Sequence, residues 1–373
     1  MKKVRKHVRG GRGGARTQRG RGAPTRSNPT HFSTRLGVVP LGPVMADTTF
    51  FQKFDDLNVL ILGDVMVDRY VGGSVTRISP EAPVPVLHWS QTDDRLGGAA
   101  NVALNVAAMG ATPLLFSVVG RDADGKRFCQ LLSDAHLNTR GIVESPERPT
   151  TLKTRFLAGS QQLLRLDRET VRPLSQREED SVLHHLRVLL DQTDVHAILL
   201  QDYNKGVLTE RMIREILLIA LRHDIPVSVD PKKDNFWRYQ RVQLFKPNLK
   251  EIRESLDPSL APNLDALRGA AREINHRLDN ALTLITLSER GVFMDDRTGG
   301  TIYPTHPRNI ADVCGAGDTV ISVATLALAA GLDAGTIAQL SNLAGGQVCE
   351  FPGVVPVNRS QLEREFAEMG VGV

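Results

Sequence analysis

The sequence predicts an α/β fold, with a mostly parallel sheet flanked by helices and a small β lid. Short apolar runs and helical patterns alternate along the chain after about residue 97, which is typical of parallel sheets covered by helices. Polar clusters follow several of the apolar runs, and ligands of open α/β sheets bind beyond the carboxyl ends of strands. The segment from Tyr70 to Trp89 has three prolines and no helical period, so it predicts short strands outside the main sheet.

The main sheet is expected to begin at the apolar run from Asn58 to Leu62, which ends at Gly63-Asp64. Gly97 then begins a glycine turn and a helix of small residues that stops at Gly110, and the next strand is expected at 113–119. Further strands are expected at 197–201, 226–230, 242–246 and 281–287. Further helices are expected at 124–133, 175–191, 209–223, 248–255, 315–330 and 334–350.

Two extended segments, 151–158 and 161–167, are predicted to form a hairpin that turns near Gly159-Ser160. Neither this hairpin nor the proline-rich segment fits a parallel sheet. Together they predict the lid, at about residues 70–90 and 150–167.

Composition favours a large globular domain. Hydrophobic residues make up 41% of the 373 residues, and no apolar run reaches the roughly 18 to 20 residues that span a bilayer, so a soluble protein without a membrane partner is expected. The three cysteines are widely spaced and predict neither a disulfide framework nor a zinc site, which favours a reducing compartment.

The net charge of +4 is unevenly distributed. Residues 1–44 hold 11 of the 46 Lys and Arg and no Asp or Glu, so the remainder has 35 basic against 42 acidic residues. This tail is predicted to be disordered because it has too few large apolar residues to offset its chain entropy. It could be a nucleic-acid-binding arm or a transit segment. We favour a third interpretation, that translation starts at Met45 and that 45–373 is the folded domain.

The glycine turn from Asp312 to Asp318 precedes a long uncharged helix. Free N–H groups and the helix dipole make such an N-terminus a site for an anion. Asp318 would lie within one turn of that anion, although an acid in the first turn also serves simply as a dipole partner.

Two glycine motifs, Gly97 to Asn101 and Asp312 to Asp318, resemble in this order the two signatures of the ribokinase (PfkB-type) family of carbohydrate kinases. The resemblance covers about Phe54 to Arg359 and is most similar to the D-glycero-β-D-manno-heptose 7-phosphate kinase branch. Further matching segments are GDVMVDRY, TRISPEAPVPV, QQLLRLD, DYNKG, VDPKK and KPNLKE.

The resemblance implies a ribokinase-like fold and assigns roles to the second motif. Asp318 would be the catalytic base that removes the proton from the accepting hydroxyl. Gly315, Ala316 and Gly317 would donate main-chain N–H groups to the transferred phosphoryl group. The implied cofactors are ATP and Mg²⁺, and the need for a monovalent cation stays open.

The resemblance also implies a nucleotide site. Residues Asn248, Leu249, Lys250 and Glu251 match the family's Asn-x-x-Glu element, in which Glu251 would reach the metal through water. The alternative is a helix capping box, and both can hold. Ser288 and Asn342 match positions near the nucleotide.

For the sugar, the resemblance implies that Asp68 accepts hydrogen bonds from ring hydroxyls. Gly97, Gly98 and Asn101 would form the adjacent floor. Asp64 would share the role of Asp68, or else serve as a turn residue at a strand end.

A sugar that already carries a phosphate needs cations. The candidates lie on the lid or at strand ends, and each could instead be a solvated surface charge: Arg155, Arg165, Lys205 and Lys232.

The resemblance implies a cytoplasmic, homodimeric enzyme that phosphorylates the anomeric hydroxyl of the heptose 7-phosphate in ADP-heptose and lipopolysaccharide core synthesis. Some relatives carry a nucleotidyltransferase domain after the kinase; since this chain ends at Val373, a separate adenylyltransferase is expected to act next. One alternative is another ribokinase-family sugar or sugar-phosphate kinase. A second is a non-catalytic protein that binds nucleic acid through the tail, which Asp318 and its glycine turn argue against.

Overall fold

The computed structural model describes residues 47–159 and 161–369. The predicted disordered tail, residues 1–44, lies outside the described residues, as does the proposed start at Met45. Among the residues that are described, no helix is both long enough and apolar enough to span a membrane.

The main sheet has nine strands in the order β13-β12-β11-β10-β9-β8-β1-β4-β5. Neighbouring strands from β11 to β5 are parallel, and β12 and β13 add an antiparallel edge. The prediction of a mostly parallel sheet is therefore confirmed. The strands are β1 (Asn58–Gly63), β4 (Thr112–Gly120), β5 (Ile142–Ser145), β8 (Ala197–Gln201), β9 (Val227–Asp230), β10 (Leu244–Phe245), β11 (Leu282–Thr286), β12 (Val292–Asp295) and β13 (Thr301–Tyr303).

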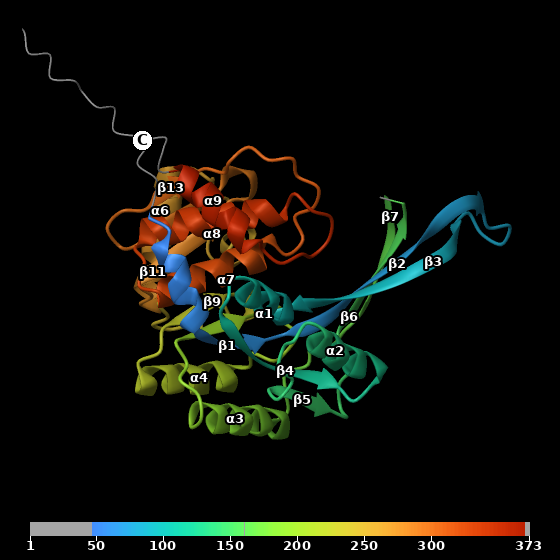
Figure 1. Cartoon of the computed structure of the whole chain (residues 1–373), viewed down its shortest axis with the longest axis horizontal. Helices are drawn as coiled ribbons and strands as arrows, with labels where there is room; N and C mark the ends of the chain where they lie inside the picture. Colours follow the sequence, from blue (N-terminus) through green and yellow to red (C-terminus); the bar gives the residue numbers. More distant parts are fainter. Residues whose placement is uncertain (1–46, 160, 370–373) are drawn as a thin grey trace, which may run out of the picture. The chain divides into compact units, whose positions relative to one another are not determined.

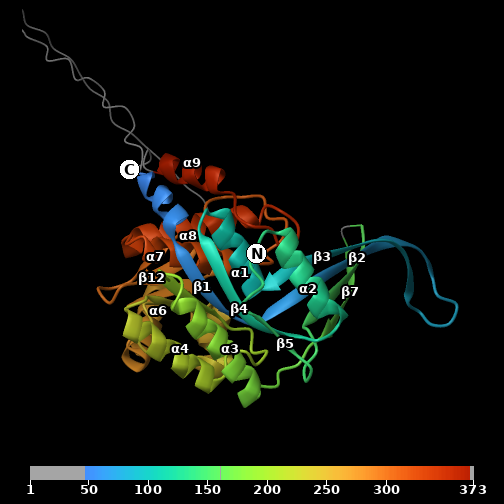
Figure 2. The same cartoon turned by 60° about the horizontal axis from the view of Figure 1, so that its bottom comes forward.

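Helices cover both faces of this sheet because its strands are apolar on both sides. In β1, Val59 and Ile61 belong to one buried cluster, whereas Leu60 and Leu62 belong to the other. The first cluster includes side chains of α1 (Ala99–Ala108), α2 (Ala123–Asp134), α7 (Ala316–Ala329), α8 (Ala334–Val348) and α9 (Arg359–Met369). The second includes side chains of α3 (Gln176–Leu190), α4 (Glu210–His223), α5 (Leu249–Ser255) and α6 (Leu264–Leu278), and Figure 2 shows α3, α4 and α6 on one side of the sheet.

A second sheet forms the predicted lid, with the strand order β3-β2-β6-β7. Its strands are β2 (Val65–Ile78), β3 (Pro85–Gly98), β6 (Leu152–Ala158) and β7 (Gln161–Arg168). Figure 1 shows these strands extending from the main sheet. The sequence predicted short strands here, but β2 and β3 are 14 residues each, with register shifts after Gly72 and Val75. Such register shifts are common where a strand contains glycine or lies next to proline, and here they allow β2 and β3 to remain paired over their length.

Candidate active site

The predicted site residues gather at the carboxyl edge of the main sheet. The neighbouring strands β10, β9, β8 and β1 lead there to Lys246, Asp230, Gln201 and Asp64. Since parallel strands end at the same edge, their last side chains meet there. The N-terminal turn of α7 brings Asp318 to this edge, where Gln201 contacts it.

Asp318 is buried, with 4% of its surface exposed. Its Oδ2 accepts a hydrogen bond from Asn101 Nδ2 at 2.8 Å. Its Oδ1 accepts from the Tyr203 hydroxyl at 2.6 Å and from Gln201 Nε2 at 3.2 Å. Burial raises the pKa of Asp318 to about 6, although the bonds from Tyr203 and Asn101 oppose the rise. The carboxylate is thus held in one orientation with a pKa suited to accepting a proton near neutral pH.

The glycine turn before α7 requires a glycine at Gly315, whose φ is +80°. A Cβ atom there would also lie 2.9 Å from Asn101 Nδ2. Within the described part of the chain, the N–H groups of Gly315, Gly317 and Asp318 have no hydrogen-bond acceptor, while that of Ala316 donates to Val313 O at 3.3 Å. The turn therefore offers free donors beside Asp318, in a geometry suited to an anion.

The lid supplies the second predicted carboxylate. Asp68 on β2 is buried and pairs with Arg155 on β6, with 2.5 Å between Oδ1 and Nη1. A Cβ atom on Gly97 would overlap Asp68 Oδ2, so only glycine allows this carboxylate to lie against β3. The structure thus brings together three residues that were predicted to bind the sugar: Asp68, Gly97 and Arg155.

Asp64 has a different environment from Asp68. Its carboxylate accepts backbone hydrogen bonds from Tyr203, Lys205 and Val207 at 2.9 to 3.0 Å. Both oxygens are therefore engaged in holding the loop that carries Tyr203. This geometry favours the alternative role of Asp64 as a structural residue at the strand end.

Each of the four predicted cations has an acidic partner. Arg155 pairs with Asp68, and Lys232 pairs with Glu251. Lys205 Nζ lies 2.6 Å from Glu169 Oε1, and Arg165, which is half exposed, lies 3.0 Å from Asp167 Oδ1. In this structure the charge of each is already balanced.

A cavity of about 760 Å³ adjoins the glycine turn. It is lined by most of the predicted nucleotide residues together with part of the turn: Asn248, Leu249, Lys250, Ser288, Asn342, Ala316 and Gly317. Apolar side chains such as Val292 and Ile310 complete the lining. Apolar walls with a few convergent polar groups are typical of a small-molecule site.

The predicted capping box is present at the start of α5. Asn248 Oδ1 accepts from Glu251 N at 2.9 Å, and Glu251 Oε2 accepts from Asn248 N at 2.8 Å. The other Glu251 oxygen pairs with Lys232. Burial raises the pKa of Glu251, as does Asp230, whereas Lys232 opposes the rise.

Residues 47–159 and 161–369 contain no cluster of three or more His, Cys, Asp or Glu that could hold a metal alone. Mg²⁺ does not need one, because it commonly binds one or two carboxylates together with waters and substrate phosphates. Glu251 is a buried carboxylate in the helical turn that lines the cavity. Its two oxygens are engaged by Asn248 N and Lys232, so the residues present fit a magnesium ion that is brought in with a nucleotide and reaches Glu251 through water.

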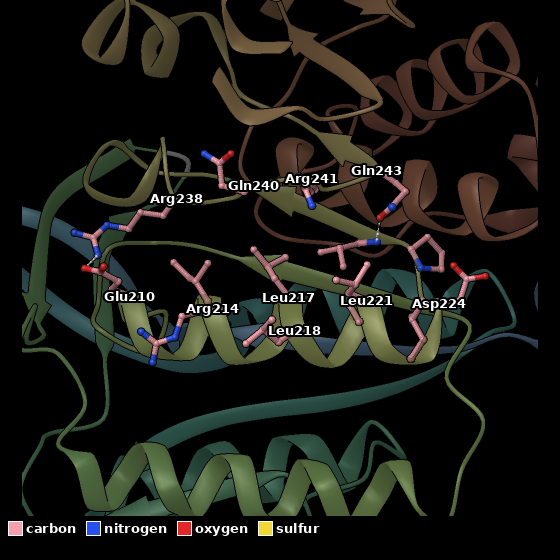
Figure 3. A pocket seen from close by; sticks show the side chains of 15 residues that line it. Glu210, Arg214, Leu217, Leu218, Leu221, Asp224, Arg238, Gln240, Arg241 and Gln243 are labelled. Carbon is pink, nitrogen blue, oxygen red and sulfur yellow. Dashed lines mark hydrogen bonds and ion pairs between the residues drawn. The ribbon is translucent and has the colours of Figure 1, made fainter. Parts of the chain in front are cut away.

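A cavity of similar size, about 750 Å³, lies between α4 and residues 238–243. Figure 3 shows Leu217, Leu218 and Leu221 of α4 along its wall. None of the predicted site residues lines it. Cavity size alone thus does not identify the active site, whereas the convergence of buried polar groups does.

Comparison with known families agrees with this geometry. The model of the pfkB family carbohydrate kinases matches residues 56–360. The chain belongs to the pfkB family.

This pfkB kinase is similar to curated bacterial proteins. It is 40% identical over 313 residues to the bifunctional protein HldE of Methylobacillus flagellatus, which covers 84% of the chain and 64% of that relative. It is 39% identical over 320 residues to the bifunctional protein HldE of Magnetococcus marinus, with 85% and 64% covered. The chain therefore spans about 64% of the length of these relatives.

Solved structures support the ribokinase-like fold. Escherichia coli phosphofructokinase-2 in complex with potassium has a TM-score of 0.69 at 20% identity, covering 84% of this chain and 99% of that one. Arabidopsis thaliana ribokinase complexed with ribose and ATP has a TM-score of 0.63 at 15% identity, covering 83% and 98%. At these identities the likeness concerns the fold.

Several residues around Asp318 in the pfkB kinase were not among the predicted site residues. Tyr203 and Gln201 bond to it directly, and Asp230 and Lys246 lie behind Gln201. A signal was present, because all four lie at predicted strand ends. Their strands are separated by tens of residues, so their mutual contacts could not be inferred.

The contact between Gly97 and Asp68 can be tested with Gly97→Ala. The added Cβ displaces Asp68 from Arg155, and we expect KM for the sugar acceptor to rise at least about tenfold, the effect of losing one charged hydrogen bond. Steady-state kinetics measure the change.

A matched control is Gly269→Ala on α6, where an added Cβ meets no atom within 4 Å and KM should not change. An unchanged KM in the folded Gly97→Ala variant would contradict the role of this contact.

Proposed function

We propose that this chain transfers the γ-phosphoryl group of ATP to the anomeric hydroxyl of D-glycero-β-D-manno-heptose 7-phosphate, giving the 1,7-bisphosphate. The observation that carries the phosphoryl transfer is the buried Asp318 carboxylate beside the free N–H groups of the α7 N-terminus. The acceptor is proposed from the segments TRISPEAPVPV and QQLLRLD. Similarity to two bifunctional HldE proteins supports the same choice.

In the proposed reaction, Asp318 accepts the proton of the anomeric hydroxyl while that oxygen forms a bond to the γ-phosphorus. The bond from the γ-phosphorus to the bridging oxygen breaks, and ADP leaves with its electron pair. The N–H groups of Gly317 and Asp318 donate to the phosphoryl oxygens as negative charge develops on them. Asn101 and Tyr203 keep the carboxylate oriented toward the acceptor.

ATP is proposed to occupy the cavity of about 760 Å³, next to the glycine turn. Glu251 would hold Mg²⁺ through water, and Mg²⁺ would neutralise charge on the phosphates. Escherichia coli phosphofructokinase-2 has been solved in complex with potassium. We propose that this chain also binds a monovalent cation.

The sugar is proposed to lie between the lid and the glycine turn, with Asp68, Asn101 and Gly98 around its hydroxyls. For the 7-phosphate we propose Arg155, because it lies on the lid beside the proposed sugar site; it would have to exchange Asp68 for the phosphate. Lys205 and Arg165 would have to exchange their acidic partners for the phosphate, and Lys232 lies nearer the nucleotide through Glu251.

In the proposed ADP-heptose route the enzyme works in the cytoplasm, where ATP is available. The product keeps a phosphate at the anomeric carbon. A nucleotidyl transfer onto this phosphate must follow, and we propose an adenylyltransferase for that step.

The proposed acceptor is tested by assaying purified protein with heptose 7-phosphate, fructose 1-phosphate and ribose side by side. We expect kcat/KM to be at least about a hundredfold higher for the heptose phosphate, because a site built for a buried phosphate discriminates strongly against acceptors that lack it or place it elsewhere. ADP release coupled to NADH oxidation measures the rates. Equal or higher kcat/KM for another sugar would replace heptose phosphate as the acceptor while leaving the kinase assignment intact.

We also propose that the kinase is a homodimer that buries the outer face of the lid. Leu164 and Leu166 on β7 are each 59% exposed, and Phe156 pairs with Leu164 on the neighbouring strand. An exposed apolar sheet face is a common protein interface.

Sedimentation should give twice the mass of one chain, and replacing Leu164 and Leu166 with Glu should give single chains. The control is Leu221→Glu on α4, a leucine outside the lid that is 71% exposed, which should stay dimeric. A wild-type protein of single-chain mass would contradict the dimer.

A further inference from the structure

A chain of buried polar side chains leads away from Asp318 below the glycine turn. Gln201 Nε2 donates to Asp318 Oδ1 at 3.2 Å and to Asp230 Oδ2 at 3.1 Å. Lys246 Nζ lies 3.1 Å from the same Asp230 oxygen. The Lys246 side chain is only 2% exposed, so water does not screen these charges effectively.

This arrangement puts two carboxylates on one amide nitrogen in a dry environment. Two buried carboxylates so close resist ionising together, and one of them would take up a proton unless a cation compensated. Lys246 is the cation paired directly with Asp230 among residues 47–159 and 161–369. It therefore allows Asp230 to stay ionised beside the base.

The position of Lys246 places its charge near the reacting groups as well. A Cβ atom on Gly317 would lie 3.8 Å from Lys246 Nζ, so the ammonium group lies close behind the glycine turn. Asp230 Oδ1 and Gln201 Oε1 are buried without a hydrogen-bond partner. The Asp230 carboxylate therefore has few hydrogen-bond partners for its negative charge, and its ionised form depends strongly on Lys246.

We propose that Lys246 is a positioning residue, which neutralises Asp230 and thereby keeps Asp318 ionised and oriented to take the proton of the acceptor. The proposal rests on the proposed phosphoryl transfer with Asp318 as base. Lys246 acts through Asp230 and through the effect of its own charge on Asp318, without contact to the acceptor.

The other charged groups facing Asp318 are consistent with this role. Burial and Asp230 raise the pKa of Asp318, whereas the Tyr203 and Asn101 hydrogen bonds and Lys246 lower it. Lys232 is nearby too; burial opposes protonation of Lys232, but Asp230, Glu251 and Asp318 together raise its pKa. Lys232 forms its ion pair with Glu251, whereas Lys246 forms the ion pair with Asp230.

The experiment compares the pH dependence of kcat for the wild type, Lys246→Met, Asp230→Asn and the double variant. The acid limb is the low-pH part of the profile, where kcat falls as the base becomes protonated. In Lys246→Met the uncompensated Asp230 should move this acid limb to higher pH by about one pH unit. In Asp230→Asn the acid limb should move to lower pH. The double variant, which lacks both charges, should return toward the wild type. Opposite shifts distinguish this role from a structural one, because lost packing lowers kcat without moving the limb in opposite directions.

Two controls keep the test decisive. Lys246→Arg preserves the charge and should keep the wild-type limb to within about half a pH unit. Lys233→Met removes an exposed lysine outside the network and should leave the profile unchanged. If Lys246→Met fails to fold, Asp230→Asn against the double variant still measures the effect of the lysine.

Limbs that shift in the same direction, or not at all, would overturn the role of Lys246. If the wild type and Lys233→Met phosphorylate the sugar normally in that case, the proposed function stands. Absence of phosphorylation by the wild type would reject the proposed function itself.

Discussion

The buried carboxylate of Asp318 is the constraint on which the rest of the site depends. Its hydrogen bonds come from α1 through Asn101, from β8 through Gln201 and from the following loop through Tyr203. A carboxylate taken out of water must keep such partners, since each one lost leaves an unpaired polar group. Three separate elements are therefore held against the α7 N-terminus, and Asp64 holds the Tyr203 loop in turn.

The lid is connected to this centre by covalent and ionic links. β2 begins at Val65, two residues after β1 ends, so the lid strand continues directly from β1, which lies inside the main sheet between β8 and β4. On the lid, Arg155 and Arg95 both lie over the ring of Tyr70, and Arg155 pairs with Asp68. The Asp68–Arg155 pair on the lid and the Asp318 carboxylate are thus held on connected elements, which favours precise placement of groups bound between them.

Much of this arrangement follows from local sequence, and the exceptions have physical reasons. Gly97 and Gly315 could be predicted because positive φ angles and close approach demand glycine, and the capping box at Asn248 was visible from its spacing. Helix α6 was not predicted, although its buried residues Leu267, Ala271, Ile274 and Leu278 recur at helical spacing. The predicted strand 242–246 is shorter in the structure, where β10 spans two residues. The backbone N–H groups of Gln243 and Lys246 on either side still donate hydrogen bonds to β9. The Lys246 network escaped prediction because its members meet only after folding.

The central claim is that Asp318 is the base of a sugar kinase, and Asp318→Asn tests it most directly. The amide keeps a similar shape but cannot take a proton. Calorimetry of this variant with a non-hydrolysable ATP analogue and with the sugar phosphate should give Kd values within about threefold of the wild type, while kcat falls by several orders of magnitude, about 10³ or more. Turnover close to the wild-type rate with intact binding would contradict the account.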